Sequence, residues 1–486
     1  MSDVHAERAR IHAQIEGQTL VDALATTAAG HADLPAYSDR HHVPDGAAWR
    51  TMTWAEVRDR ALDVAAGLVE LGVAPGDTVA IMATNRIEHF VADMGAVHAA
   101  ATPMSIYNTL SPEQVAYVAG ESLPTIVFVE TADHRARWAR ALEQSDSITT
   151  VISIEDDWAD LVASGAAYRL AHPDLLEQRH RALSPDSPAT ILYTSGTTGH
   201  PKGVVLTHYN VLYESVSTQE QAGLTEPQTM VSYLPLAHIA ERVLGLYGPQ
   251  MIGGHTHAIG DPAELLATLG EVHPTAFFGV PRVWEKIKTG ISAKLAADPD
   301  PANREMVQSS MAAGLAWVEA QAVGGTMTPE IEAAYAEAEG AILGFLKLLL
   351  GLDQVTWAGS AAAPMPLDVA KFMAGLGLTV YDVYGMTETC GAVTANGPQG
   401  FKLGSVGRAT PGMEVVLGED NEILVRGPVT TPGYYHQDQA TKALIDEDGF
   451  VHTGDIGELD DDGFFKVVDR KKELIITSAG KNIAPS

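Results

Sequence analysis

The chain has 486 residues, too many for one compact core, so two or more domains or subdomains are expected. Hydrophobic residues make up 46% and charged residues 19%, which is typical of a globular protein and excludes a disordered one. The net charge of -31 disfavours nucleic acid and anionic membranes as partners of the whole chain, although a local basic pocket can still hold a phosphorylated ligand.

Cysteine usage and apolar runs indicate the compartment. Cys390 is the single cysteine and cannot form an internal disulfide, which is consistent with a reducing cytoplasm. The N-terminus shows no apolar core of a signal peptide. The longest apolar run, residues 341–352, contains Lys347 and is shorter than the ~20 residues that span a bilayer. We therefore expect a cytoplasmic protein without a transmembrane segment, and we interpret the run as a core helix.

Helices and short apolar strands alternate along most of the chain. Thr53 and Glu56 form a capping box that begins a helix, and Gly72 ends it. Strands are predicted at residues 79–82, 125–129, 150–154, 189–194, 204–207 and 380–383. This alternation indicates an α/β architecture with buried, largely parallel sheets.

Two later regions differ from this pattern. Residues 286–350 are rich in Ala and Glu and predict a surface layer of helices with breaks at 298–301 and 324–325. Hairpin patterns follow, with strands predicted at 413–417, 422–425, 456–459 and 464–468. We predict a small antiparallel β subdomain at residues 404–468, after an α/β core at residues 1–403.

A loop between two predicted strands has the composition of a phosphate site. Its glycines let the backbone approach a ligand, its hydroxyls add donors, and its lysine adds a positive charge. The loop residues are Thr194, Ser195, Gly196, Thr197, Thr198, Gly199, Lys202 and Gly203. This composition predicts polyphosphate binding rather than an unliganded flexible hairpin. The spacing and the strand that follows differ from those of a P-loop NTPase.

The loop resembles the phosphate-binding signature of the adenylate-forming superfamily, which includes acyl-CoA synthetases, luciferases and the adenylation domains of peptide synthetases. Other segments match the family in its order: YLPLAH at 233–238, WAGSA at 357–361, YGMTET at 384–389, TGD at 453–455 and DRKK at 469–472. Several ordered matches are far more specific than any single one. The resemblance covers essentially the whole chain.

The resemblance implies an ATP site whose parts lie far apart in the sequence. The implied nucleoside contacts are Gly359, Ser360 and Ala361 beside the adenine, Asp382 near its exocyclic amine, Tyr384 with Gly385 at its ring, and Asp455 with Arg470 at the ribose hydroxyls. From the residues alone, these positions are also typical of a tight turn, a core aromatic and a solvated carboxylate.

The resemblance also implies a phosphate and metal half of the site. Thr387 would meet the α-phosphate, and Glu388, with Thr194, would hold Mg²⁺, which prefers hard oxygen ligands and phosphates. By default, Thr387 and Glu388 would instead favour the first turn of a helix. With Lys202 and His238 they are the candidate catalytic residues.

The acyl side is implied by two apolar segments. His238 and Gly359 would lie beside the acyl carboxylate, although a lone histidine is by default a core residue. Amino-acid-activating relatives carry an aspartate near the start of segment 233–238, and none stands there, so an uncharged tail is favoured. Segments 236–242 and 279–285 resemble long-chain acyl-CoA synthetases, in which an aromatic near Trp284 gates an apolar tunnel; a core tryptophan is the alternative.

The implied substrates are ATP with Mg²⁺, a fatty acid and coenzyme A, and the implied reaction forms acyl-AMP and then acyl-CoA. The alternatives are a fatty acyl-AMP ligase that loads a carrier protein, an aryl or medium-chain acid–CoA ligase, and a non-catalytic nucleotide- or lipid-binding protein. Acyl chain length, oligomeric state and loose membrane association are left open by the sequence.

The implied fold is α/β: a large N-terminal adenylating domain of two α/β sheet subdomains plus a small antiparallel β-barrel subdomain. Lys472 matches the hinge of the family, and a surface lysine is its alternative reading. The family continues beyond this point with a C-terminal domain that brings the lysine promoting adenylation. We expect residues 469–486 to be the hinge and the start of a truncated C-terminal domain, and the chain to bind ATP and acid but to adenylate and transfer poorly.

Overall fold

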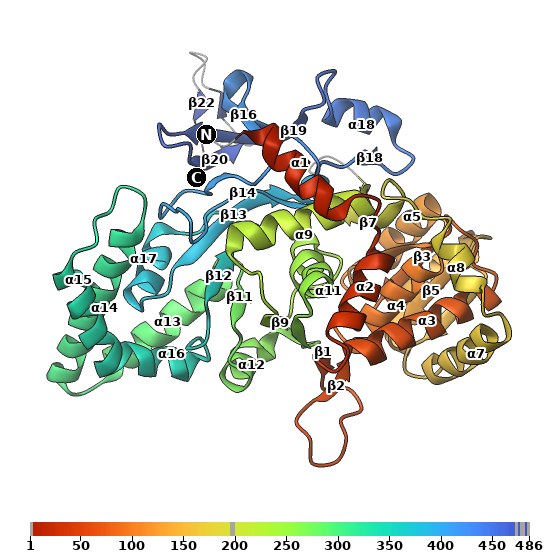
Figure 1. Cartoon of the computed structure of the whole chain (residues 1–486), viewed down its shortest axis with the longest axis horizontal. Helices are drawn as coiled ribbons and strands as arrows, with labels where there is room; N and C mark the ends of the chain where they lie inside the picture. The colour runs from red at the N-terminus through yellow and green to blue at the C-terminus, as the bar shows by residue number, and fades with distance from the viewer. Residues whose placement is uncertain (1–2, 195–199, 472–474, 477–481, 484–486) are drawn as a thin grey trace.

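The computed structural model describes residues 3–194, 200–471, 475–476 and 482–483. Two α/β lobes lie side by side, and a β-rich cap lies above them (Figure 1). The α/β class with a separate antiparallel sheet is confirmed. The domain boundaries at residues 403/404 and 468/469 stay a prediction.

The lobe on the right of Figure 1 contains a four-stranded parallel sheet in the order β4-β3-β5-β6. Its strands are β3 (Thr78–Met82), β4 (Thr102–Ser105), β5 (Ile126–Val129) and β6 (Thr150–Ser153). The helices of this part of the chain are α3 (Trp54–Glu70), α4 (Ile87–His98), α5 (Pro112–Ser122), α6 (Ala132–Gln144), α7 (Trp158–Ala171) and α8 (Leu175–His180). Strands β3, β4 and β5 are wholly buried, which explains the nearly continuous apolar sequences of β3 and β5.

A second sheet has the order β2-β1-β10-β9. Its strands are β1 (Pro35–Asp39), β2 (Arg50–Thr53), β9 (Thr229–Ser232) and β10 (His255–Ala258). The connection from β9 to β10 consists of α10 (Ile239–Glu241), the π-helical η1 (Arg242–Tyr247) and α11 (Gly248–Ile252). His238 therefore lies between strand β9 and the first turn of this connection.

The third sheet has the order β11-β12-β13-β14-β15 and belongs to the left-hand lobe. Its strands are β11 (Ala276–Phe278), β12 (Trp357–Ser360), β13 (Val380–Met386), β14 (Gly391–Ala395) and β15 (Arg408–Ala409). The first three strands are parallel, and β14 returns antiparallel to β13. The helical elements here are η2 (Pro262–Glu264), α12 (Leu265–Val272), α13 (Pro281–Ala297), α14 (Pro301–Gln321), α15 (Pro329–Ala338), η3 (Glu339–Leu343), α16 (Gly344–Leu350) and α17 (Leu367–Gly375).

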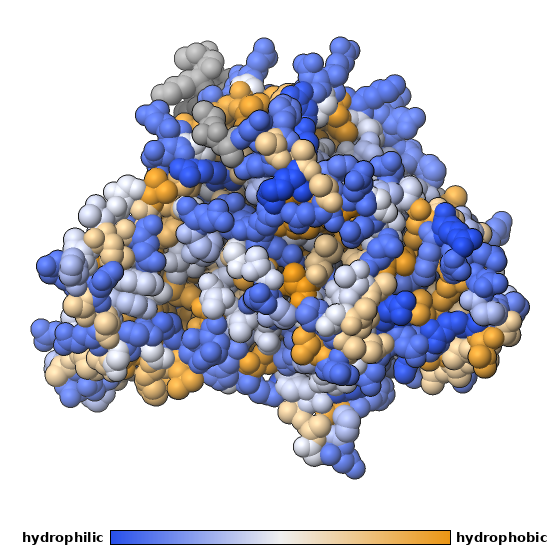
Figure 2. All heavy atoms as spheres, viewed as in Figure 1, coloured by the Kyte–Doolittle hydropathy of each residue, from blue (hydrophilic) through white to orange (hydrophobic). Residues whose placement is uncertain are grey.

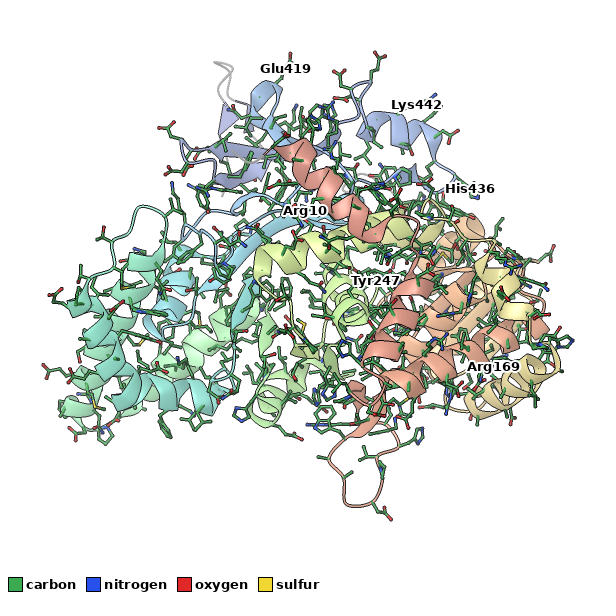
Figure 3. The ribbon with its side chains drawn as sticks, viewed as in Figure 1. Arg10, Arg169, Tyr247, Glu419, His436 and Lys442 are labelled. Carbon is green, nitrogen blue, oxygen red and sulfur yellow. The ribbon has the colours of Figure 1, made fainter. Side chains whose placement is uncertain are left out.

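A three-stranded antiparallel sheet, β18-β8-β7, brings together segments far apart in the sequence. Its strands are β7 (Pro188–Thr194), β8 (Lys202–Thr207) and β18 (Gly433–Tyr434). Strand β8 runs directly into α9 (His208–Ala222), and α1 (Val4–Ile15) crosses above this helix in Figure 3. Arg10 of α1 donates hydrogen bonds of 2.6 and 2.5 Å to the two carboxylate oxygens of Glu220, so α1 is held on α9.

The cap confirms the predicted hairpins as a four-stranded antiparallel sheet in the order β16-β17-β19-β20. Its strands are β16 (Glu414–Leu417), β17 (Glu422–Arg426), β19 (Val451–Leu459) and β20 (Phe465–Arg470). The remaining elements are α2 (Leu20–Gly30), η4 (Thr387–Thr389), η5 (Glu419–Asn421), α18 (Asp438–Leu444), β21 (Ile475–Ile476) and β22 (Asn482–Ile483).

The interpretation of residues 341–352 as a core helix was wrong. Phe345, Leu348 and Leu349 of α16 are 55%, 49% and 59% exposed, whereas Leu343 and Leu352 at the two ends of the run are buried. The helix packs on its neighbours with one side only, and apolar surface is visible at the lower left of Figure 2. Among the described residues, no helix is long and apolar enough to cross a membrane.

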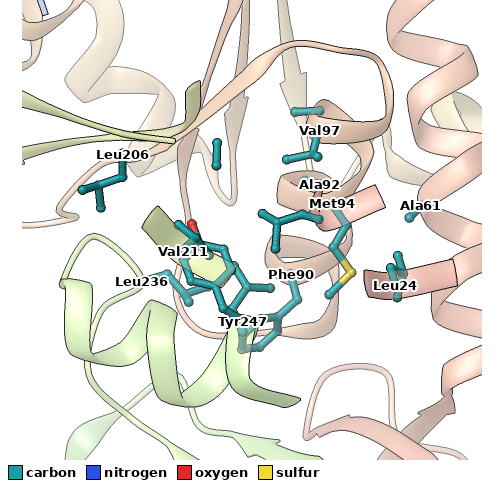
Figure 4. Packing of buried hydrophobic residues seen from close by; sticks show 14 of the residues in the cluster. Leu24, Ala61, Phe90, Ala92, Met94, Val97, Leu206, Val211, Leu236 and Tyr247 are labelled. Atoms are coloured by element: carbon teal, nitrogen blue, oxygen red, sulfur yellow. The ribbon is translucent and has the colours of Figure 1, made fainter. Parts of the chain in front are cut away.

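The largest cluster of buried side chains joins the right-hand lobe to the segment that contains His238. Figure 4 shows Leu24 on one side of this cluster, Leu236 on the other, and Phe90 beside Tyr247 between them. The ring of Tyr37 stacks on Phe90 at 4.5 Å between centroids. Segment 236–247 is thus fixed by the core, and it is not a free surface loop.

Glu214 connects helix α9 to the start of strand β14. Its carboxyl accepts hydrogen bonds from the backbone N–H of Ala392 (2.7 Å) and from the hydroxyl of Thr218 (2.9 Å). Gly391 leaves the necessary room, because a β-carbon there would lie 2.7 Å from the same carboxylate oxygen. Complete burial raises the pKa of Glu214 to about 8.

The free energy of unfolding should therefore fall with rising pH because of Glu214. Above the ordinary value of 4.5 and below about 8, the unfolded chain has lost this proton and the folded chain keeps it. Relative to Glu214→Gln, the wild-type chain should lose about 1.4 kcal/mol for each pH unit between about pH 5.5 and 7.5. Urea unfolding at several pH values measures this difference. The control is Glu226→Gln at an exposed position, and parallel curves for wild type and Glu214→Gln would contradict the prediction.

Candidate active site

The predicted phosphate loop closes the hairpin of β7 and β8. Thr194 is the last residue of β7 and Lys202 the first of β8, and the two pair directly across the hairpin. Both side chains are partly exposed. The other predicted loop residues, Ser195, Gly196, Thr197, Thr198 and Gly199, lie outside the described residues, as does the predicted hinge Lys472.

The structure brings Lys202 and Glu388 to one place through a residue that the sequence analysis missed. The phenol of Tyr434 donates a 2.7 Å hydrogen bond to Oε1 of Glu388, and Nζ of Lys202 lies 4.7 Å from the centroid of the Tyr434 ring. Glu388 is buried, and Thr387 precedes it in turn η4. Gly433 and Tyr434 form a strand too short to give a pattern in the sequence, so the only available signal was two tyrosines after a Pro-Gly turn.

Three predicted nucleoside residues form one hydrogen-bonded group. The phenol of Tyr384 donates to Oδ2 of Asp455 at 2.7 Å, and Nε of Arg470 lies 2.8 Å from Oδ1 of the same carboxylate. Asp455 and Arg470 face each other across β19 and β20. Burial and the charge of Asp455 raise the pKa of Tyr384, so its hydroxyl stays protonated and donates. The group joins the left-hand lobe to the cap.

The residues predicted beside the adenine lie at the end of strand β12 and within the adjacent parallel strand β13. Gly359 and Ser360 end β12, Ala361 follows them, and Ser360 pairs with Asp382 of β13. Burial raises the pKa of Asp382 to about 7, so this carboxyl keeps its proton in a large fraction of molecules at neutral pH. Gly385 is needed for a structural reason, because a β-carbon there would lie 1.6 Å from the carbonyl oxygen of Gly391.

His238 is held in one tautomer by its own helix. Its Nδ1 accepts a 3.2 Å hydrogen bond from the backbone N–H of Ala240, so the ring carries its proton on Nε2. Burial lowers the pKa of His238, which keeps the imidazole neutral at pH 7. A neutral imidazole with a fixed Nε2–H is a hydrogen-bond donor for a carboxylate.

The two acyl-side segments meet at Tyr233, whose hydroxyl oxygen accepts a 3.2 Å hydrogen bond from the N–H of Val280. Trp284 is fully buried, donates from its indole to the carbonyl oxygen of Gly279 at 2.8 Å, and packs edge-on against Phe277. The N–H of Gly279 in turn donates to the carbonyl oxygen of Gly359. The structure therefore places Trp284 in the core, close to the end of β12.

A small cavity lies beside Tyr233. Its lining consists of Met230, Val231, Ser232, Tyr233, Glu241, Leu244, Gly245 and Phe278. Glu241 is its single acidic group, and its Oε2 accepts a 3.0 Å hydrogen bond from the N–H of Leu234. Burial raises the pKa of Glu241 to about 7. This carboxyl supports the backbone of segment 233–238, a role that its place in an Ala-Glu-Arg sequence did not indicate.

Comparison with known proteins identifies the family. The model of the AMP-binding enzymes matches residues 24–435. FadD15 of Mycobacterium bovis, a long-chain-fatty-acid–CoA ligase, is 33% identical over 465 residues, which are 93% of this chain and 75% of that relative. The chain belongs to the AMP-binding enzyme family, as its ordered motifs predicted.

Two other relatives are longer than this chain. The putative fatty-acid–CoA ligase fadD11 of Mycobacterium tuberculosis is 41% identical over 310 residues, which are 64% of this chain and 54% of fadD11. The long-chain-fatty-acid–CoA ligase ACSBG2 of Xenopus laevis is 32% identical, with 90% of this chain and 62% of ACSBG2 covered. The match thus spans less than two thirds of the length of each of these two relatives.

Solved structures show the same fold. The ATP-bound MatB of Rhodopseudomonas palustris superposes with a TM-score of 0.72 at 23% identity, covering 96% of this chain and 82% of MatB. The N-terminal domain of FACL13 from Mycobacterium tuberculosis gives a TM-score of 0.69 at 23% identity, covering 93% of this chain and all of that domain. At these identities the likeness concerns the fold alone.

The side chain of His238 accepts the hydrogen bond that caps helix α10, and substitutions can test this structural role apart from any role toward a substrate. His238→Ala should lower the free energy of unfolding by about 1 kcal/mol or more, because the N–H of Ala240 loses its acceptor. His238→Asn keeps a capping oxygen and should lose less than about half of that. Urea unfolding of the two variants beside the wild type measures the effect, and equal losses in both would show that the cap contributes nothing.

Proposed function

We propose that this chain activates a fatty acid with ATP and Mg²⁺ and that the acyl group then passes to coenzyme A. The proposal is carried by two groups of side chains, each of which is assembled from segments far apart in the sequence. In the first group, Lys202 and Glu388 both contact Tyr434. In the second group, Tyr384 and Arg470 both contact Asp455. The first group has the charges to hold phosphates and a cation. The second has the paired acceptors that a ribose requires.

The chemistry consists of two displacements. A carboxylate oxygen of the acid attacks the α-phosphorus of ATP and expels pyrophosphate, which gives acyl-AMP. The thiol sulfur of coenzyme A then attacks the acyl carbon, loses its proton and expels AMP. Protein side chains form no covalent bond with the substrates in these steps. The protein accelerates such reactions mainly by orienting the reactants and by stabilising the charge of the transition state.

Each predicted site residue has one task in this proposal. Lys202 offsets the negative charge of the phosphates, Thr387 donates to the α-phosphate, and the Tyr384 ring stacks on the adenine. The Nε2–H of His238 donates to the acid and keeps its carboxylate oriented for attack. Neutral His238 suits this task, because it can donate without forming an ion pair that would have to be broken.

The residues present fit a magnesium ion. Glu388 offers a carboxylate of which Tyr434 engages Oε1, and Thr194 offers a hydroxyl at the end of β7. In the described part of the chain, no group of three or more His, Cys, Asp or Glu could hold a metal, which agrees with an ion bound mainly by phosphates and one or two protein oxygens. When bound, Mg²⁺ would neutralise charge on the phosphates.

A fatty acid is the favoured substrate because the acyl side offers no fixed charge. The acidic group next to segment 233–238 is Glu241, and its Oε2 accepts a hydrogen bond from the backbone N–H of Leu234 in that segment. Relatives named as long-chain-fatty-acid–CoA ligases support this class. A structural neighbour is an anthranilate CoA ligase, so aryl acids are the proper comparison. We propose that Trp284 moves to admit the acyl tail.

Pyrophosphate exchange tests the acid class. The 486-residue chain is given ATP, Mg²⁺ and labelled pyrophosphate. In the presence of a long-chain fatty acid, label should pass slowly from pyrophosphate into ATP. In the presence of aryl or amino acids, no label should enter ATP above background. Lys202→Met should lower the rate about 100-fold, since one charge aimed at the phosphates is lost. Coenzyme A and an acyl carrier protein are then added in turn to the enzyme-bound acyl-AMP. The one that receives the acyl group is the acceptor.

Three outcomes would redirect the assignment. Preference for aryl or amino acids would replace the acid class. ATP binding without exchange for any acid would favour the non-catalytic nucleotide- or lipid-binding alternative. Transfer to the carrier protein but not to coenzyme A would favour the acyl-AMP ligase.

The ribose assignment makes a separate prediction. Wild-type chain should bind ATP at least about tenfold more tightly than dideoxy-ATP, which lacks both ribose hydroxyls, because hydrogen bonds to a charged acceptor are strong. Asp455→Asn should reduce this preference to less than about threefold. Calorimetry with both nucleotides measures it, with Asp461→Asn at an exposed cap position as the matched control. An undiminished preference in Asp455→Asn would rule the assignment out.

A further inference from the structure

Tyr434 contacts both charged groups of the proposed phosphate half. Its hydroxyl donates to Oε1 of Glu388 at 2.7 Å, and its ring faces Nζ of Lys202 at 4.7 Å from the centroid. None of the motifs in the sequence analysis includes it. A single side chain between two oppositely charged groups can set the distance and orientation of both.

The backbone around Tyr434 is fixed from three directions. Strand β18 pairs with β8, so Tyr434 lies opposite Val204, two residues from Lys202. The N–H of Thr431 donates to the carbonyl oxygen of Glu388 at 2.8 Å. The N–H of Tyr434 donates to the hydroxyl of Thr441 at 2.9 Å. These contacts hold the ring between strand β8, which carries Lys202, and turn η4, which carries Glu388.

Gly433 makes this close packing feasible. Its φ of 146° lies in a region that side chains rarely adopt, and a β-carbon there would come within 2.5 Å of Thr441. A glycine directly before the tyrosine therefore lets α18 pack against the strand. The position of the ring is thus built into the cap, and it does not depend on a flexible surface contact.

The chemistry of each contact points to a distinct task. A hydrogen bond to one oxygen of a ligating carboxylate orients that carboxylate toward its metal. An aromatic face attracts an ammonium without neutralising it, so the charge stays available for a phosphate. Neither contact requires Tyr434 to touch the substrate.

We propose that Tyr434 is a positioning residue of this site, whose hydroxyl orients Glu388 for the divalent cation and whose ring holds the Lys202 ammonium toward the phosphates. The inference rests on the proposed function, since it concerns the same ATP site. It assigns the cap a direct part in organising the phosphate half.

Three variants separate the two contacts. Tyr434→Phe removes the hydroxyl and keeps the ring, Tyr434→Leu removes both, and Tyr435→Phe removes a neighbouring hydroxyl as the matched control. The measurements are the affinity for ATP without metal, by calorimetry, and the affinity of the ATP-bound chain for Mn²⁺ in place of Mg²⁺, by electron paramagnetic resonance. Circular dichroism and thermal unfolding verify that each variant is folded.

The hydroxyl should act on the metal alone. Tyr434→Phe should weaken Mn²⁺ binding about tenfold, as is typical when a hydrogen bond to a metal ligand is removed. Its affinity for metal-free ATP should stay within about twofold of the wild type, because the ring over Lys202 is retained. Tyr434→Leu should weaken both affinities, and Tyr435→Phe neither. A purely structural role would not separate the two measurements in this way.

A double-mutant cycle with Glu388→Gln provides the second test. If the hydroxyl acts through Glu388, Tyr434→Phe should cause no further loss of Mn²⁺ affinity in the Glu388→Gln background. Unchanged or tighter Mn²⁺ binding by Tyr434→Phe, or a full additional loss in the double variant, would overturn the inference while the proposed function stands. A wild-type chain that binds no ATP would overturn both.

Discussion

The buried ion pair of Arg242 and Asp93 is the constraint on which the position of the segment containing His238 depends. Arg242 is completely buried, and its Nη2 lies 2.9 and 2.7 Å from the two oxygens of Asp93 on α4. It also donates to Ser105 at the end of β4 and to the phenol of Tyr247. Each of the three guanidinium nitrogens of Arg242 therefore has a hydrogen-bond partner inside the protein. Loss of one partner would leave an uncompensated buried charge, which typically costs about 3–5 kcal/mol.

The position of Arg242 explains why this pair matters for the site. It directly follows residues 238–241, the segment that includes His238 and Glu241, and it begins the π-helical turn η1. Arg242 fixes that turn to helix α4 through Asp93 and to strand β4 through Ser105. The imidazole of His238 and the cavity beside Tyr233 therefore keep their places relative to the core. The phosphate half is fixed differently, by hydrogen bonds between strand β18, strand β8 and the turn at Glu388.

Much of this organisation could be predicted from the sequence because it is local or motif-based. The apolar strands β3 and β5 and the cap hairpins have patterns that depend only on neighbouring residues. The ordered motifs indicated that Tyr384, Asp455 and Arg470 belong to one site, and the structure shows them hydrogen-bonded. Their roles toward ATP stay predictions, as do those of the loop residues outside the described part of the chain.

What the sequence could not predict was set by contacts between distant segments. The two-residue strand β18 has no pattern of its own, so the contact of Tyr434 with Glu388 was not foreseen. Helix α16 was wrongly assigned to the core, because an apolar run does not reveal how many of its sides another element will cover. The lateral order β4-β3-β5-β6 likewise follows from packing between elements and not from their order in the chain.

The electrostatics of the site follow one rule. Buried groups without a fixed counter-charge are held close to neutrality: burial raises the pKa of Asp382 and of Glu241 to about 7 and lowers that of His238. The charges that remain are those of Lys202 and Glu388 around Tyr434, and of Asp455 beside Arg470. A chain with a net charge of -31 repels an anionic nucleotide at long range, but salt screens that repulsion beyond roughly 8 Å. Within that distance the local charges dominate, and in the proposed function they face the phosphates and the ribose of ATP.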